Sequence, residues 1–283
     1  MGPVVAVQTC NPLLRTPLAL ISDDSCPVIN KAWYWIKDRH DWRLRTRPGD
    51  EPEGWERHYD KLGSMPKAIP AEFVRRWGSW CAAEGIKGKY SAVPFPAGVG
   101  RIDEGFPGFP RGELSAWLRA VDEAIRPGFD VTPEMITHTR VVDLDRWALT
   151  DEWEQGEWVD PPADRLGEYV AAAMRLLRNA GIACEGVTSP GAFGRDKEAA
   201  YARAVLEASI AVNADPRPFY FLHVVHDGMP ALALHEVDRA RGRAVASIPA
   251  CAGDWFGATG WDEADPDRFI TEDLAGGRLP PVI

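Results

Sequence analysis

Short apolar segments alternate with amphipathic helical segments four times along this chain of 283 residues. Short apolar segments bounded by turn residues are typical of buried strands. The helical segments carry apolar residues at spacings of three and four, as a helix with one buried face requires. This alternation indicates βαβ units and a parallel sheet. A chain of this length can form one α/β domain of barrel size, so we expect a single domain over 1–283.

The helices and strands can be assigned along the chain. Helices are expected at about 70–84, 111–125, 164–180 and 198–212, and strands at 18–21, 86–94, 129–137, 182–188 and 219–225. The first helix is expected to bury Phe73, Val74, Trp77 and Cys81. Segments 232–237 and 244–248 are typical of a β-hairpin, and the polar stretch 38–70 indicates a long surface insertion.

The charge and apolar content exclude several partners. The chain has 32 Lys and Arg against 42 Asp and Glu, a formal charge of −10, which disfavours nucleic acid and anionic lipid. No apolar run is long enough to span a membrane, and residues 1–9 do not resemble a signal peptide. We therefore expect a cytoplasmic protein. The five cysteines are far apart, which argues against a disulfide framework and a structural zinc site.

Twelve tryptophans are unusually many for this length. They are either large core residues or, in part, the aromatic walls of a sugar-binding groove. Several lie in loop-like sequence, which favours the groove for three clusters: Trp33/Trp35/Trp42, Trp147/Trp153/Trp158 and Trp255/Trp261.

Polar residues follow the expected strands at the ends where a parallel α/β fold places its active site. They are Asp23-Asp24 after the first strand, Arg101, Asp103 and Glu104 after the second, His138, Arg140 and Asp143 after the third, Thr188-Ser189-Pro190 after the fourth, and His223 or His226 with Asp227 after the fifth. Carboxylates and imidazoles that meet on one rim are what a hydrolytic metal site requires.

The aspartate doublet is the strongest of these features. Two adjacent carboxylates raise the pKa of one of them unless a cation neutralises the pair. A divalent ion held by Asp24 would do so and would leave Asp23 as a general base. The alternative is a solvated turn or helix cap, which aspartate also favours.

Two histidines can contribute to such a site. His138, at the tip of the third strand, is either a metal ligand or a hydrogen-bonded residue of the rim. His223 and His226 point to opposite faces of an extended segment, so at most one of them faces the site. We expect His223 and Arg140 to act as further catalytic residues.

Three stretches resemble the polysaccharide deacetylases, the carbohydrate esterases of the NodB-homology type. L-A-L-I-S-D-D-S at 18–25 is similar to the first motif of that family, in which an Asp-Asp pair ends the first strand. Residues 73–98 resemble the family's first helix and second strand, and residues 177–191 resemble a helix, strand and proline-containing loop that border its site. The resemblance extends over about 15–275, and the Asp-Asp motif is its closest part.

The resemblance implies an α/β fold, a deformed (β/α)7 barrel of the glycoside hydrolase/deacetylase type. It also implies that Asp23 is the general base and Asp24 a metal ligand. Members of the family remove acetyl groups from sugars with Zn²⁺ or a similar ion, which is bound by one Asp and two His. A water on the metal attacks the acetyl carbonyl, and a later His protonates the leaving group.

The chain also departs from the family's pattern. The family has two histidines four residues apart, whereas the residue four positions after His138 is Val142. Asp143 is then the candidate substitute ligand, one position further on. The family's Arg in the loop after the fourth strand has no counterpart in Thr188-Ser189-Pro190, although Arg195 is nearby. The last strand, which carries the proton-donating His, is expected to be absent because the sequence ends at Ile283.

Three functions are compatible with these observations. The leading hypothesis is a metal-dependent hydrolase of the deacetylase type, which acts on an acylated sugar or a related C–N or ester bond and holds a divalent ion, expected to be Zn²⁺, with Asp24 and His138. The second is a non-catalytic sugar-binding relative. The third is a metal-free barrel glycosidase that pairs Asp24 with Glu104 or Glu185. The expected partner is a small molecule or a glycan, and a homo-oligomer is left open.

Overall fold

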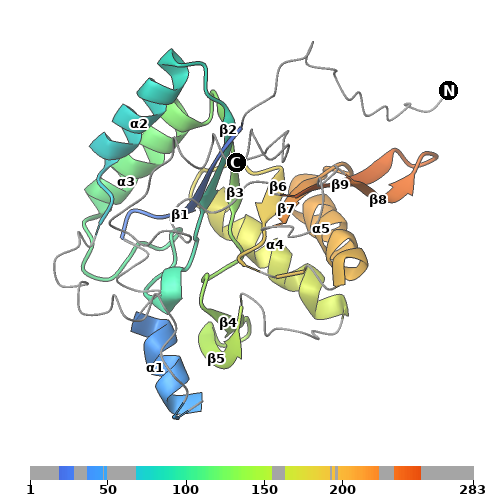
Figure 1. Cartoon of the computed structure of the whole chain (residues 1–283), viewed down its shortest axis with the longest axis horizontal. Coiled ribbons are helices and arrows are strands. Elements are labelled where there is room, and N and C mark those ends of the chain that lie inside the picture. The colour runs from blue at the N-terminus through green and yellow to red at the C-terminus, as the bar shows by residue number, and fades with distance from the viewer. Residues whose placement is uncertain are drawn as a thin grey trace, which may run out of the picture.

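The computed structural model describes residues 19–28, 37–46, 48–49, 68–154, 163–191, 193–194, 197–222 and 233–249. Figure 1 shows a central group of strands, with α2 (Ala71–Ala83) and α3 (Arg111–Ala120) at the left of the view and α4 (Ala163–Asn179) and α5 (Glu198–Asn213) at the right. The mixed α/β architecture expected from the alternating pattern is therefore confirmed. No helix in the described parts of the chain is both long and apolar enough to cross a bilayer.

Seven strands follow one another in a row. They are β1 (Leu20–Ser25), β2 (Gly88–Ala92) and β3 (Phe129–Pro133) in one sheet, and β6 (Gly186–Thr188), β7 (Phe219–Leu222), β9 (Arg243–Pro249) and β8 (Ala233–Asp238) in the next. A parallel bridge between Glu134 and Thr188 joins the two sheets. Every neighbouring pair in the row is parallel except β8 and β9, which form the expected C-terminal hairpin.

The described strands do not close into a barrel. β1 and β8 stand at the two ends of the row, and no pairing between described residues joins them. The coarse α/β expectation therefore holds, and the described residues do not show a closed (β/α)7 barrel.

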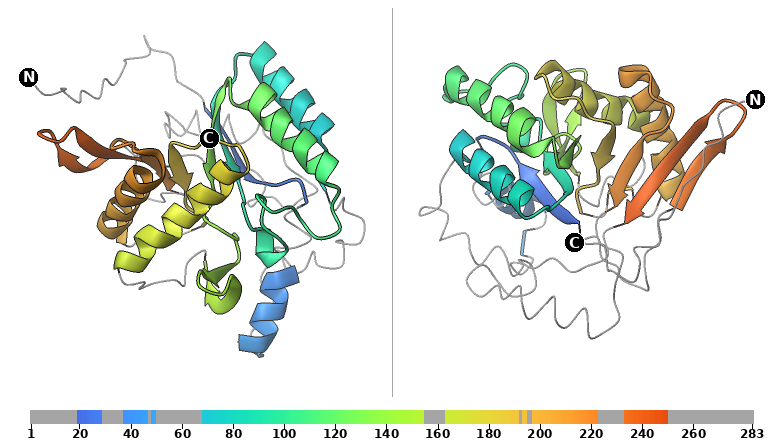
Figure 2. Two further views of the ribbon diagram at one scale, coloured as in Figure 1. Left: turned by 180° about the vertical axis from the view of Figure 1, so that it is seen from behind. Right: turned by 90° about the horizontal axis from the view of Figure 1, so that it is seen from above.

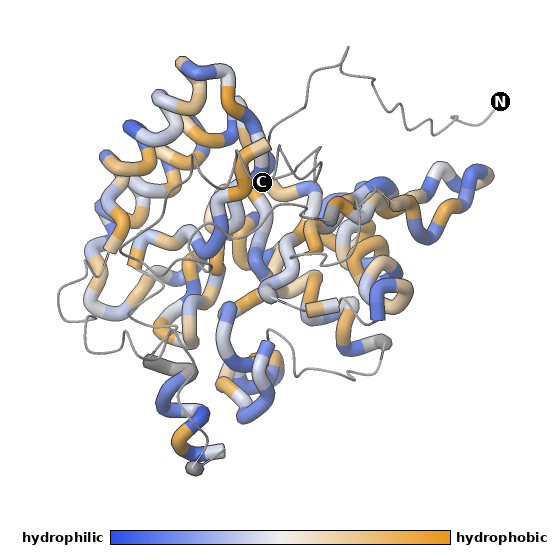
Figure 3. The backbone as a smooth tube through the Cα atoms, in the orientation of Figure 1, coloured by the Kyte–Doolittle hydropathy of each residue, from blue (hydrophilic) through white to orange (hydrophobic). Residues whose placement is uncertain are grey.

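The helices agree with the periodicity of the sequence. They are α1 (Lys37–Thr46), α2 (Ala71–Ala83), α3 (Arg111–Ala120), α4 (Ala163–Asn179) and α5 (Glu198–Asn213), with a 3-10 turn η3 (Pro96–Gly98) and a π-helical turn η4 (Val121–Ile125) that continues α3. Hydrophobic and hydrophilic residues alternate along α2 and α3 (Figure 3), as expected of helices with one buried face. Gly85, at a positive φ of 68°, follows the end of α2 as the sequence predicts.

One residue of α2, Phe73, is exposed although the sequence predicts that it is buried. The buried residues of this helix are Val74, Gly78 and Cys81, at spacings of four and three, whereas Phe73 is 58% exposed. The spacing of one residue between Phe73 and Val74 turns their side chains about 100° apart on a helix, so the two cannot share a narrow buried stripe.

The two faces of the sheet differ in chemistry. On β2, Tyr90 faces the helices and contacts the rings of Trp77 and Trp117. Its neighbours Lys89 and Ser91 lie on the other face, because side chains alternate along a strand. The right-hand view of Figure 2 shows α2, α3, α4 and α5 along one side of the strands. The face away from the helices is therefore polar, although Lys89 and Ser91 are buried on it.

A second hairpin, which the sequence pattern does not predict, follows β3. It consists of β4 (Arg140–Asp143) and β5 (Ala148–Trp153), paired antiparallel. Buried and exposed residues do not alternate along its strands. The sequence therefore lacks the alternating apolar pattern that predicts a strand. Trp153 is 4% exposed, and its ring packs 5.3 Å from that of Trp42 in α1. This contact anchors the described part of the expected polar insertion; residues 47 and 50–67 of that insertion lie outside the described residues.

Candidate metal centre

The aspartate doublet lies in a β-bulge at the end of β1. Ser22 pairs with Tyr90 and Ser25 with Ala92, so β1 advances three residues where β2 advances two. The extra residue breaks the alternation of side chains, and Asp24 takes the left-handed conformation with a φ of 56°. In a regular strand the two aspartates would point to opposite faces. The bulge instead lets both carboxylates contribute to one polar site.

Glu134 and His138 reach the same site from the end of β3. Glu134 directly follows the strand and is 1% exposed. The chain then turns through Met135 and His138, both at positive φ (45° and 61°), and so brings the His138 ring back over the strand end. Residues other than glycine in this conformation are uncommon and often occur at functional sites.

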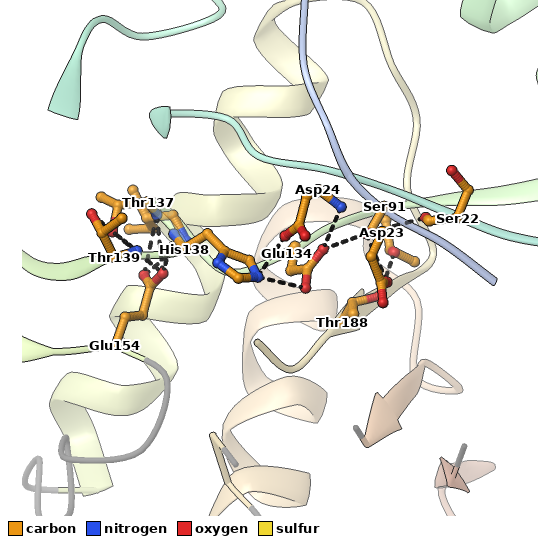
Figure 4. Close-up of polar contacts among 12 residues, drawn as sticks. Ser22, Asp23, Asp24, Ser91, Glu134, Thr137, His138, Thr139, Glu154 and Thr188 are labelled. Atoms are coloured by element: carbon orange, nitrogen blue, oxygen red, sulfur yellow. Dashed lines mark hydrogen bonds and ion pairs between the residues drawn. The ribbon is translucent and has the colours of Figure 1, made fainter. Parts of the chain in front are cut away.

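Three side chains converge at this point (Figure 4). Nε2 of His138 lies 2.5 Å from Oδ1 of Asp24 and 3.1 Å from Oε1 of Glu134. The Asp24 backbone N–H also donates to Oε2 of Glu134 at 2.9 Å. One ligating atom from each residue lies within 4.8 Å of the other two. All three residues are buried, so their charges are weakly screened and strongly coupled.

The protonated imidazole offsets one of the two negative charges of this group. Burial lowers the pKa of His138, but the carboxylates of Asp24 and Glu134 outweigh that effect and raise its pKa to about 10. The ring is therefore a cation at neutral pH, held between two carboxylates. A divalent cation bound by the same atoms would take over this role and release the proton.

Asp23 faces a different partner from Asp24. Its Oδ1 forms an ion pair with Nζ of Lys89, which is only 2% exposed. Ser91 Oγ lies 3.3 Å from Asp23 Oδ1 and 2.5 Å from Glu134 Oε2, and so bridges the two carboxylates. The Asp23 side chain keeps 30% of its surface exposed, more than Asp24, which leaves it open to a small molecule.

A fourth carboxylate, that of Glu154, is hydrogen-bonded to the backbone at His138 and at the two residues before it. It follows β5, is fully buried, and accepts hydrogen bonds from the N–H groups of Ile136, Thr137 and His138. Burial raises the pKa of Glu154, and the hydrogen bond from the Tyr169 hydroxyl, with those from the backbone, acts against this rise. Figure 4 shows Glu154 beneath the 137–139 backbone, on the far side from Asp24.

Three further residues were expected at the site: Arg140, Asp143 and His223. Arg140 begins β4, and its guanidinium donates to the Thr150 carbonyl of β5 at 3.4 Å. Asp143 accepts from the N–H groups of Asp145 and Arg146 and thereby caps the β4–β5 turn, so it is not part of the three-residue group. His223 lies outside the described residues.

Sequence reasoning missed Glu134, Lys89, Ser91 and Glu154. A signal was available for Glu134, because it follows an expected strand and stands four residues before His138. Lys89 and Ser91 alternate with Tyr90 in the second strand, which marks a polar face but not its partners. Glu154 carried no local signal, since its partners lie mostly across the hairpin turn.

Comparison of this chain with protein-family models, with curated proteins and with solved structures finds no match in any of the three.

Proposed function

We propose that this chain is a metal-dependent hydrolase of the polysaccharide deacetylase type, which acts on an acylated sugar or a related C–N or ester bond. The observation that carries the proposal is the convergence of Asp24, Glu134 and His138 on one buried point. Two carboxylates and one imidazole from two strand ends make a site of hydrolytic chemistry rather than a structural ion pair alone.

The donor set fits a divalent cation. Two carboxylate oxygens and an imidazole nitrogen are ligands of Zn²⁺ and of Mn²⁺, and three protein ligands leave further positions for water and substrate. Two negative charges from Asp24 and Glu134 would be offset by the ion. Such an ion polarises a carbonyl oxygen and lowers the pKa of a bound water.

Asp23 is the residue we assign as general base. It is adjacent to Asp24 and directed to the same polar side of the sheet through the bulge. Its partial exposure would let it take a proton from an attacking water, and the Lys89 ammonium compensates its charge inside the fold. The Ser91 hydroxyl contacts both the base and Glu134, so that a change of charge on one carboxylate affects the other.

The spacing of the ligands supports the deacetylase type. The family that the sequence resembles has two histidines four residues apart, and Glu134 and His138 have this spacing with glutamate in the first position. We propose that Glu134 and His138, rather than His138 and Val142, correspond to that pair. We further propose that the curved row of strands is the barrel of that family in an open form.

The other two functions have less support. Trp42 and Trp153, expected on the wall of a sugar-binding groove, are buried against each other. Of the partners considered for a glycosidase, Glu185 precedes β6 at the opposite end of the sheet from Asp24, and Glu104 is exposed and paired with Arg101. The polar groups around Asp24 therefore favour metal chemistry.

The test is acetate release from acetylated substrates by the metal-loaded chain. N-acetylglucosamine oligomers, acetylated xylan and p-nitrophenyl acetate would be incubated with protein loaded with Zn²⁺ or Mn²⁺. We expect hydrolysis of at least one of them, its loss on chelation, and a fall in kcat of about 100-fold or more in Asp23→Asn. The exposed Asp145→Asn is the matched control and should retain full activity. Activity that survives both chelator and Asp24→Asn, or no activity on any substrate, would overturn the proposal.

A further inference from the structure

The carboxylate of Glu154 is bound by an unusual number of donors. Oε1 accepts from the Ile136 N–H (3.0 Å) and the Tyr169 hydroxyl (2.6 Å). Oε2 accepts from the N–H groups of Thr137 (3.1 Å) and His138 (2.5 Å), and the Thr137 hydroxyl lies 3.4 Å away. Three consecutive N–H groups therefore point at one buried carboxylate, as Figure 4 shows for its labelled residues.

This convergence depends on the backbone conformation around it. Consecutive N–H groups point the same way only where the chain leaves the extended form, and such concave sets of N–H groups bind anions. Met135, which precedes the three donors, and His138, the last of them, are at positive φ. The left-handed conformation costs a residue with a side chain about 1 kcal/mol, so it persists where the surroundings enforce it.

The loop is also tied down beyond Glu154. The Glu154 N–H donates to the Thr139 carbonyl at 2.6 Å. The Val142 N–H donates to the Tyr169 oxygen at 3.2 Å, while the Tyr169 hydroxyl donates to Glu154. The path from α4 through Tyr169 and Glu154 to the His138 backbone is thus continuous and buried.

We propose that Glu154 is a positioning residue, which fixes the His138 backbone so that its imidazole faces Asp24 and Glu134 ready for a cation. This inference rests on the proposed metal site. It goes beyond that site by assigning a role to a carboxylate that does not belong to the ligand group. Outer partners that orient ligands typically change metal affinity 10- to 100-fold when altered.

The experiment compares Glu154→Gln and Tyr169→Phe with the wild-type chain and with Glu152→Gln. Glu152 is an exposed glutamate of β5, two residues before Glu154, and serves as the matched control. Glutamine replaces one acceptor oxygen by an amide group that cannot accept the N–H bonds. Co²⁺ binding is followed by titration and by visible absorption, which reports the geometry around the ion. Hydrogen exchange of the 136–138 amides and thermal unfolding are measured on the same samples.

The expected result for Glu154→Gln is a folded protein with Co²⁺ affinity about 10-fold or more below wild type, an altered Co²⁺ spectrum and faster exchange of the 136–138 amides. Tyr169→Phe should show the same changes to a smaller extent, and it decides the question if Glu154→Gln does not fold. Glu152→Gln should match the wild type.

Unchanged Co²⁺ affinity and spectrum in the folded variants, beside a wild type that binds, would overturn this inference alone. A wild-type chain that binds no Co²⁺ would overturn the proposed function and this inference with it.

Discussion

Asp24 and His138 both adopt the left-handed backbone conformation, and their side chains meet with Oδ1 of one 2.5 Å from Nε2 of the other. One comes from a bulge in β1 and the other from the loop after β3. Two locally unfavourable backbone conformations thus allow the contact between the Asp24 carboxylate and the His138 ring. Strain that the surrounding structure maintains at a single point is a common property of functional sites.

Removal of the Lys89 ammonium should destabilise the fold. Lys89→Met keeps most of the side-chain volume but leaves the Asp23 carboxylate without its buried cation. We expect a loss of about 3 kcal/mol in the free energy of unfolding, at the lower end for a buried pair because Asp23 is partly exposed. Urea unfolding measures it, and the double variant Lys89→Met/Asp23→Asn should recover part of the loss. A single variant as stable as wild type would show that the pair contributes nothing.

A close backbone approach favours glycine at position 78 in α2. A Cβ at this position would collide with the carbonyl group of Ala124 in η4, whereas a Cβ on Gly112 in α3 would meet nothing within 4 Å. Gly78→Ala should therefore lower the free energy of unfolding by about 2 kcal/mol, as overpacking does. Gly112→Ala, the matched control, should be neutral or stabilising by up to about 1 kcal/mol. Equal effects of the two substitutions would contradict the packing described between α2 and η4.

Glu198 should make stability depend on acid pH. Burial raises the pKa of this carboxyl, but hydrogen bonds from Ser247 and Tyr220 and the neighbouring His235 outweigh it, so its pKa lies below 4.5. A depressed pKa in the folded state stabilises the protein at pH values above the unfolded pKa, and this stabilisation is lost as the pH falls through the folded pKa.

The difference in stability between wild type and Glu198→Gln should therefore be full near pH 6 and should shrink below about pH 4.5. Chemical unfolding at a series of pH values measures it. A difference that stays constant from pH 6 to pH 3 would show that the charge of Glu198 has no part in it.

Most of the fold could be predicted from the sequence because local periodicity determines it. The helices α4 and α5 begin and end within a residue or so of the expected positions, since their apolar stripes and the glycine at Gly181 are local signals. The β4–β5 hairpin could not be predicted in the same way. Its burial does not alternate, so its strands exist through pairing with each other rather than through a pattern of their own.

The site was predictable only in part. Asp24 and His138 were found because each follows an apolar strand. Glu134 was within reach of the same reasoning, because it follows an expected strand and stands four residues before His138. The ion pair of Asp23 with Lys89 depends on a bulge, and the role of Glu154 on contacts across a hairpin; neither leaves a mark in the local sequence.

The most direct test of the account is equilibrium metal binding by the purified chain and by Asp24→Asn, Glu134→Gln and His138→Gln. Calorimetric titration with Zn²⁺ and Mn²⁺ at neutral pH should give one bound ion per wild-type chain, with release of protons because the cation replaces the proton on His138. Each of the three variants should lose that binding, while Asp145→Asn should retain it. Equal binding by the wild type and the three variants, or none by the wild type, would contradict the claim that these side chains form a metal site.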